Sequence, residues 1–438
     1  MIKISGVRKT NNFYFILASL LIISFHVASF IPKINNFEDE LIALTSHIFF
    51  LTELEFKAPF LVDEMIFTPA LTTGFNSSIG GALAWIIHQD FYFSRLFNFI
   101  WLVLEISLFN FYLYKNKIIN VRFLYYSILG LFCIPLWYNS LYGLGEILSS
   151  VIFFNSILLY EKNSKLSMFL MSISIFFGKF IIFLSFLVFI TFNIKKQNRN
   201  GILYFALPPA VWLFIIYIKT GVDNLIIYLN RFVGLLFSAG LSKSNSSSNF
   251  FLEAKNNIAI SEIADWSYAT IIRVAIVPLV FSLFLLFKYF LTKNSILDLS
   301  ISIIIITNYL YFYLFSYQKY LRYSQIFLVI TIYYLLYLLS NEEKLPNVEK
   351  FTVILLLSIY LSSELLILLF ILYSVLRFRK KTIFLSLFAF LLLNILNLQY
   401  ESRNYIKSNL NISECKNNIS SISCIKKYLP YDYKILEK

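Results

Sequence analysis

Long apolar runs alternate with short polar segments along most of the chain. Many runs approach the roughly 20 residues that an α-helix needs to cross a bilayer, so the pattern predicts membrane-spanning helices. The predicted spans are Phe13–Phe30, Arg95–Tyr114, Phe123–Trp137, Leu141–Tyr160, Leu166–Phe177, Phe180–Phe192, Ile202–Ile218, Ile272–Leu291, Leu297–Phe315, Tyr323–Leu339, Phe351–Leu361, Leu365–Leu376 and Ile383–Leu398.

Two of these stretches, Leu166–Phe192 and Phe351–Leu376, can each be read as one long tilted helix or as two short ones. The basic clusters between the runs favour two short helices in both cases, because only then do the clusters share the cytoplasmic side. We therefore expect an all-α polytopic membrane protein with about 11–13 transmembrane helices, a cytoplasmic N-terminus and an extracytoplasmic C-terminal tail.

The composition agrees with a single integral membrane domain over residues 1–438. The chain is 59% hydrophobic and 14% charged, whereas soluble domains carry about 25% charged residues. The net charge of +13 comes from Lys and Arg in short clusters between apolar runs, so it orients helices and does not indicate nucleic acid as a partner. The abundant Phe and Tyr are expected mostly to face lipid or the interface.

Three polar regions are predicted outside the cytoplasm: a first outer loop at 32–94, a middle outer loop at 220–271 and the tail at 399–438. The tail contains Cys415 and Cys424, which can form a disulfide or remain two free thiols. The chain has no CxxC motif and its three histidines are scattered, so no zinc site is predicted.

The first outer loop is the most acidic part of the chain. Seven of the 24 acidic residues fall between Glu38 and Glu64. A surface helix with one apolar face is predicted here by the spacing of Phe37, Leu41, Leu44, Ile48 and Leu51. Stabilisation by the helix dipole is sufficient to explain Glu38 in its first turn. A carboxylate cluster just outside a bilayer can also act as a general base on a membrane-anchored substrate.

Several short motifs follow one another in a familiar order. They are Phe37-Glu-Asp-Glu-Leu41, Thr68-Pro-Ala-Leu-Thr-Thr-Gly74, Phe93-Ser-Arg-Leu-Phe-Asn98, Tyr142-Gly-Leu-Gly-Glu146, Gly178-Lys179 and Gln318-Lys-Tyr-Leu-Arg-Tyr323. In order and predicted sidedness they resemble the membrane glycosyltransferases of the GT-C superfamily, relatives of protein O-mannosyltransferases and lipid A aminoarabinose transferases. The resemblance covers about the first 190 residues and, more weakly, the 318–323 segment.

The resemblance implies a hexosyl- or pentosyltransferase that uses a polyprenyl-phosphate sugar in the bacterial inner membrane. The acceptor would be a lipid, a glycan or a protein. Asp39 and Glu40 match the acidic pair of the first outer loop, and Asp39 is the expected base. The expected donor phosphate-binding residues are Arg95, Lys179, Lys319 and Arg322, and those expected at the cavity mouth are Asp63, Glu64 and Glu146.

Each of these assignments has a structural alternative. Arg95, Lys319 and Arg322 can simply snorkel to the interface, and Glu105 is expected to be the structural partner of another charge inside the membrane. No metal or other cofactor is assigned, although the Asp63–Glu64 pair has oxygen ligands suited to Mg or Mn.

Two other functions remain open. An O-antigen-type polysaccharide polymerase or ligase relies on basic residues in a large later loop, whereas the concentrated charge here is acidic and early. A transporter or flippase of lipid-linked glycans predicts charges along the middle of several helices and internal repeats, and little of either is visible.

Overall fold

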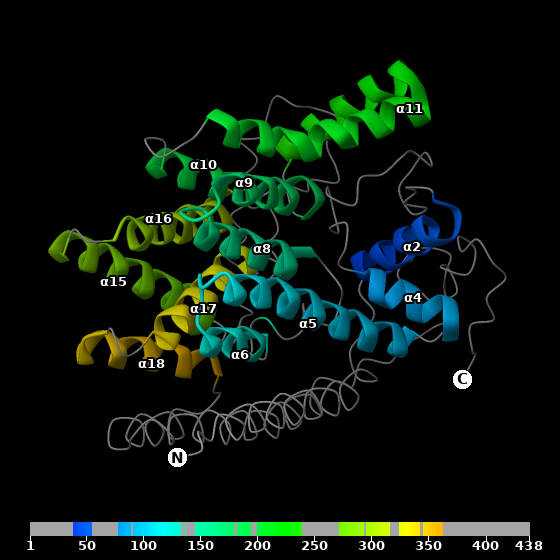
Figure 1. Ribbon diagram of the computed structural model, residues 1–438. Coiled ribbons are helices and arrows are strands. Elements are labelled where there is room, and N and C mark those ends of the chain that lie inside the picture. Colours follow the sequence, from blue (N-terminus) through cyan, green and yellow to red (C-terminus); the bar gives the residue numbers. More distant parts are fainter. Residues whose placement is uncertain are drawn as a thin grey trace, which may run out of the picture.

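The computed structural model describes residues 38–54, 78–88, 91–131, 133, 136, 145–178, 182–193, 199–238, 271–292, 295–315, 324–341 and 345–361. This part of the chain is almost entirely helical and contains no strand, which confirms the all-α prediction there (Figure 1). The α-helices are α2 (Glu38–Glu53), α4 (Ile79–His88), α5 (Phe91–Lys115), α6 (Val121–Gly130), α8 (Gly145–Leu159), α9 (Ser164–Ile173), α10 (Ile182–Asn193), α11 (Arg199–Ser238), α15 (Val277–Thr292), α16 (Ile296–Leu310), α17 (Gln325–Ser340) and α18 (Asn347–Leu361). Single π-helical turns are η2 (Ser174–Gly178), η4 (Ile272–Ile276) and η5 (Tyr311–Phe315).

Three helical segments are long and apolar enough to cross a membrane: Phe93–Lys115, Ile272–Leu291 and Ile296–Leu314. Much of their surface is both apolar and exposed; Phe287 and Phe290 on α15, for example, are 65% and 68% exposed. Water tolerates large apolar patches poorly, and lipid tails would cover them at no cost. These helices suggest association with a bilayer.

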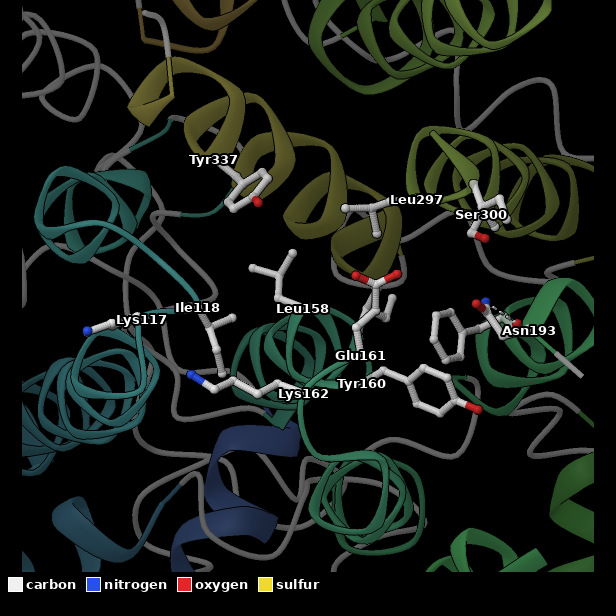
Figure 2. Close-up of a pocket in the computed structure, with 13 residues that line it drawn as sticks. Lys117, Ile118, Leu158, Tyr160, Glu161, Lys162, Asn193, Leu297, Ser300 and Tyr337 are labelled. Atoms are coloured by element: carbon white, nitrogen blue, oxygen red, sulfur yellow. Dashed lines mark hydrogen bonds between the residues drawn. The ribbon is translucent and has the colours of Figure 1, made fainter. Parts of the chain in front are cut away.

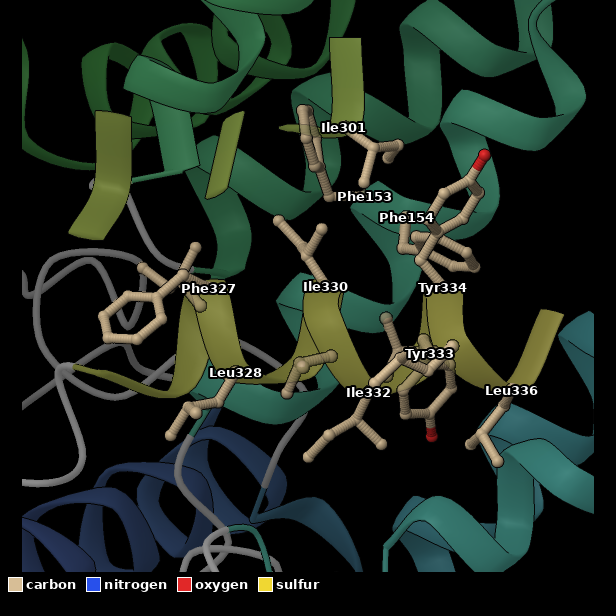
Figure 3. Close-up of a cluster of buried hydrophobic side chains, with 14 of the residues drawn as sticks. Phe153, Phe154, Ile301, Phe327, Leu328, Ile330, Ile332, Tyr333, Tyr334 and Leu336 are labelled. Atoms are coloured by element: carbon tan, nitrogen blue, oxygen red, sulfur yellow. The ribbon is translucent and has the colours of Figure 1, made fainter. Parts of the chain in front are cut away.

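Helix α17 forms the centre of the bundle. Every residue of α17 except Tyr337 is buried, and the helix packs against α6, α8, α16 and α18. Figure 3 shows Phe153 and Phe154 of α8 and Ile301 of α16 gathered over one side of α17. A helix that is apolar on all sides must be enclosed by protein or by lipid, and here neighbouring helices enclose it.

Buried amides and hydroxyls connect the central helices. Asn155 of α8 donates to Asn110 Oδ1 of α5 (2.8 Å), and Asn110 donates to the Ser127 hydroxyl of α6 (2.7 Å). Tyr333 of α17 donates to the backbone carbonyl of Ser127 (2.8 Å). Interhelical bonds of this kind hold apolar helices in a fixed register, because a polar group without a partner is costly away from water.

The stretch Leu166–Phe192 contains two separate helical segments, α9 with η2 and then α10. Lys162, before α9, and Asn193, at the end of α10, line the same cavity. The chain therefore runs away from this end of the bundle and returns to it, as expected for two short helices. In the other ambiguous stretch, α18 ends at Leu361 and the following residues lie outside the described part.

Helix α11 extends further than the sequence predicts. The predicted span Ile202–Ile218 forms its first half, and the helix resumes after a break at Gly221, whose φ of +79° lies in the left-handed region. The region predicted as the middle outer loop is thus helical as far as Ser238.

Candidate functional site

The acidic pair lies at the start of α2. The helix begins at Glu38, so Asp39 and Glu40 belong to its first turn, where the helix dipole favours negative charge. The predicted helix in the first outer loop is confirmed. Leu44 and Ile48 of the predicted apolar face are buried and Leu51 is half-buried. This face packs on α4.

Helix α4 fastens α2 to the beginning of α5. The backbone N–H of Gly81 donates to Asn98 Oδ1 across the α4–α5 contact (2.7 Å). A Cβ atom at Gly80 would lie only 2.6 Å from the carbonyl oxygen of Phe97, so the close approach of the two helices requires glycine there. α2, α4 and the N-terminal part of α5 thus form one unit at one end of the bundle (Figure 1).

Arg95 lies within this unit, four residues after the start of α5. Its side chain is fully buried, and Ser94 and Asn98 beside it are also buried. A snorkelling arginine would extend its guanidinium to the aqueous boundary. The Arg95 side chain is enclosed, so it does not snorkel. A buried guanidinium is costly unless it is paired or hydrogen-bonded. Arg95 therefore belongs to the packed interior of this unit.

Glu146 lies in the first turn of α8 and is only 2% exposed. Its backbone carbonyl accepts a hydrogen bond from the Ser150 hydroxyl (2.6 Å). The helix dipole favours a carboxylate in the first turn, whereas enclosure away from water costs a charged group free energy. The structure brings Glu146 into the packed bundle.

Other predicted site residues lie outside the described part of the chain: Asp63, Glu64, Lys179, Lys319 and Arg322. The same is true of Cys415 and Cys424. Within the described ranges, no three His, Cys, Asp or Glu side chains gather as metal ligands. The suggestion of Mg or Mn at Asp63 and Glu64 therefore stays a prediction.

A cavity of about 290 Å³ opens at the opposite end of the bundle (Figure 2). Its walls come from the turn after α5, the end of α8, the end of α10, the start of α16 and the end of α17. The charged and polar residues that line it are Lys117, Glu161, Lys162, Asn193, Ser300, Tyr160 and Tyr337. Sequence reasoning missed this cavity, because its walls come from five separate parts of the chain.

An ion cluster adjoins that cavity and ties four helices together. Lys288 Nζ of α15 lies 3.2 Å from Asp298 Oδ2 of α16 and 3.0 Å from Glu349 Oε2 of α18. Tyr334 of α17 donates a hydrogen bond to Asp298 Oδ1. Sequence reasoning missed this cluster too. The sequence does hold one indication of it: Lys288 lies near the end of one predicted span and Asp298 near the start of the next.

The two ends of the bundle thus carry different chemistry. One end has the acidic first turn of α2 and, in the same unit, the buried Arg95 of α5. The other end has a polar cavity and an ion cluster. In comparisons with known proteins, no family model, no curated protein and no solved structure matches this chain.

Proposed function

We propose that the protein is a polytopic membrane glycosyltransferase, which moves a hexose or pentose from a polyprenyl-phosphate donor to an extracytoplasmic acceptor. The observation that carries the proposal is the acidic first turn of α2, with Asp39 and Glu40, close behind the first long apolar run. This helix belongs to the same unit as the buried Arg95. Transfer from a lipid phosphate requires both a base for the acceptor and a cation for the phosphate.

In the proposed reaction the Asp39 carboxylate accepts the proton that the acceptor hydroxyl or amine loses as it attacks the anomeric carbon. A bond forms between the acceptor and that carbon. The bond from the carbon to the phosphate oxygen breaks, and its electron pair leaves with the lipid phosphate. Glu40, the second residue of the acidic pair, is the next candidate for the base.

The leaving phosphate gains negative charge, which a preorganised cation stabilises. We assign this role to Arg95 together with Lys179, Lys319 and Arg322. Asp63 and Glu64 are assigned to the mouth of the substrate cavity, whereas Glu146, which is enclosed in the bundle, is no longer assigned to it. The acceptor, whether a lipid, a glycan or a protein, contributes the hydroxyl or amine that attacks.

The proposal includes a location and a topology. The protein would lie in the bacterial inner membrane with about 11–13 spans, since its Lys and Arg clusters follow the positive-inside pattern. The end of the bundle that carries α2 would face outward, and the end that carries Lys117 and Lys162 would face the cytoplasm.

The direct test of the mechanism is the variant Asp39→Asn. The amide keeps the size of the side chain but cannot accept the proton, so kcat for sugar transfer should fall by about 10² to 10⁴. Transfer is measured with purified protein in liposomes that contain lipid-linked donor.

The matched control is Glu38→Gln, one residue earlier in the same helical turn. It removes a charge from the same helix terminus and should leave kcat close to the parent value, because helix-terminal charges contribute little. If kcat fell equally in the two variants, the loss would come from the changed charge at the helix terminus, and Asp39 would not be the base.

A further inference from the structure

In the cavity at the end of the bundle away from α2, the basic and acidic side chains lie on different sides. Figure 2 shows the amines of Lys117 and Lys162 on one side and the Glu161 carboxylate projecting toward α16 and α17 on the other. All three side chains are exposed to solvent, and the Lys162 amine also donates a hydrogen bond to the backbone carbonyl of Asn116.

Neutral polar groups lie on the carboxylate side. Ser300 is only 1% exposed, and its hydroxyl has no hydrogen-bond partner among the described residues, although it lines the cavity. A buried hydroxyl without a partner costs free energy, and a bound polar ligand would remove that cost. Asn193 of α10 also lines the cavity, and its amide donates to the backbone carbonyl of Phe189 (2.9 Å).

The remaining wall is apolar. Ile118, Leu158, Leu297 and Phe189 also line the cavity. The cavity opens at the end of a bundle in which three helical segments are long and apolar enough to cross a bilayer. Such an end would lie at the level of lipid headgroups. Basic pockets between such helices are known to hold phosphate headgroups.

We infer that this cavity binds a phosphate ester that carries a primary ammonium group, as in the headgroup of phosphatidylethanolamine. The phosphate would contact Lys117 and Lys162, and the ammonium would contact Glu161 and the Ser300 hydroxyl. The separation of charge selects against an anionic headgroup without an amine, which the Glu161 carboxylate repels. This site is independent of sugar transfer at the other end of the bundle.

The test compares two short-chain lipids that share acyl chains and phosphate. Dioctanoyl phosphatidylethanolamine has the amine, and dioctanoyl phosphatidylglycerol lacks it. Binding to the purified full chain in detergent is followed by native mass spectrometry. The parent should bind the ethanolamine lipid about tenfold more tightly, since one charge-assisted contact differs.

Three variants locate the contacts. Glu161→Gln should abolish the preference for the amine, the double change Lys117→Gln with Lys162→Gln should weaken both lipids, and Ser300→Ala should weaken the ethanolamine lipid alone. Unchanged binding of the ethanolamine lipid by Ser300→Ala would mean that the Ser300 hydroxyl does not contact the ligand. Lys115→Gln is the matched control, because Lys115 is exposed near the same end but does not line the cavity.

Glycerophosphoethanolamine, which has no acyl chains, identifies the source of the headgroup. Binding as tight as that of the lipid would support the same recognition with a soluble ligand, and much weaker binding would support a membrane lipid. Equal binding of the two lipids by the parent, or an amine preference that persists in Glu161→Gln, would overturn the proposal. Thermal unfolding of each variant confirms that it is folded.

Discussion

At the scale of single residues, Lys288, Asp298 and Glu349 form ion pairs between three helices. Lys288 contacts two carboxylates from two helices, and Asp298 also accepts a hydrogen bond from the fully buried Tyr334. Asp298 is also more buried than Glu349: its side chain is 4% exposed, against 18% for Glu349. The two carboxylates should differ in their contribution to stability.

We expect Asp298→Ala to lower the free energy of unfolding by about 1–3 kcal/mol, because it leaves the buried Tyr334 hydroxyl without its acceptor. Glu349→Ala should cost less than about 1 kcal/mol, as is usual for a partly exposed ion pair. Reversible unfolding in mixed micelles measures both. Equal losses would mean that the hydrogen bond from Tyr334 adds nothing.

At the scale of helices, one close contact depends on a missing side chain. Gly178, the last residue of η2, packs on α8. A Cβ atom there would collide with Ser149 Oγ and lie 2.6 Å from Ser149 Cβ, but it would lie at 3.5 Å from Ser149 Cα. The obstacle is thus the Ser149 side chain and not the backbone.

This geometry predicts compensation. Gly178→Ala should destabilise the protein by about 1–3 kcal/mol through overpacking. The double variant Gly178→Ala with Ser149→Gly should recover part of that loss, because only an ordinary contact with the Cα atom would remain. The same unfolding assay tests it, with Ser149→Gly alone as the reference. A double variant as unstable as the sum of the single changes would contradict this packing.

Most helices of the described part coincide with predicted apolar runs, because length and apolar composition determine them. The exceptions are α4 and the part of α11 after Gly221, which lie in regions predicted as outer loops. Which helix lies at the centre was not predictable. α17 reads as a lipid-facing span, since a helix surrounded by protein and one surrounded by lipid have the same apolar composition. For the same reason Tyr333 and Tyr334, expected to face lipid or the interface, are in fact buried in the core.

The candidate site was predictable in part. The start of α2 followed from a helical apolar pattern preceded by acidic residues, and both are local properties of the chain. The burial of Arg95 and the cavity at the other end were not, because each depends on contacts between segments that are far apart in sequence.

At the scale of the whole molecule, the described turns divide between two ends of the bundle. Leu54 follows α2 at one end, while Lys117 and Lys162 line the cavity at the other. α5 connects the two ends with 25 residues, which is about 37 Å of helix. That length is sufficient to cross the hydrocarbon core of a bilayer.

Cysteine labelling tests this arrangement in a cysteine-free background. An impermeant thiol reagent added to intact cells should label Leu54→Cys, and it should label Lys117→Cys and Lys162→Cys only after the membrane is opened. Leu54 is 67% exposed, so access is not limited by packing. Labelling of Leu54→Cys and Lys117→Cys from the same side would mean that α5 does not cross the membrane.

The central claim is that the protein transfers a sugar from a lipid phosphate, and donor consumption tests it most directly. Purified protein in liposomes is incubated with a panel of polyprenyl-phosphate hexoses and pentoses, radiolabelled in the sugar, together with a bacterial envelope extract as the source of acceptor. The account predicts that label from at least one donor moves to acceptor with the parent protein and stays on the lipid with Asp39→Asn. Label that stays on every donor with the parent, or moves equally with Asp39→Asn, would contradict it.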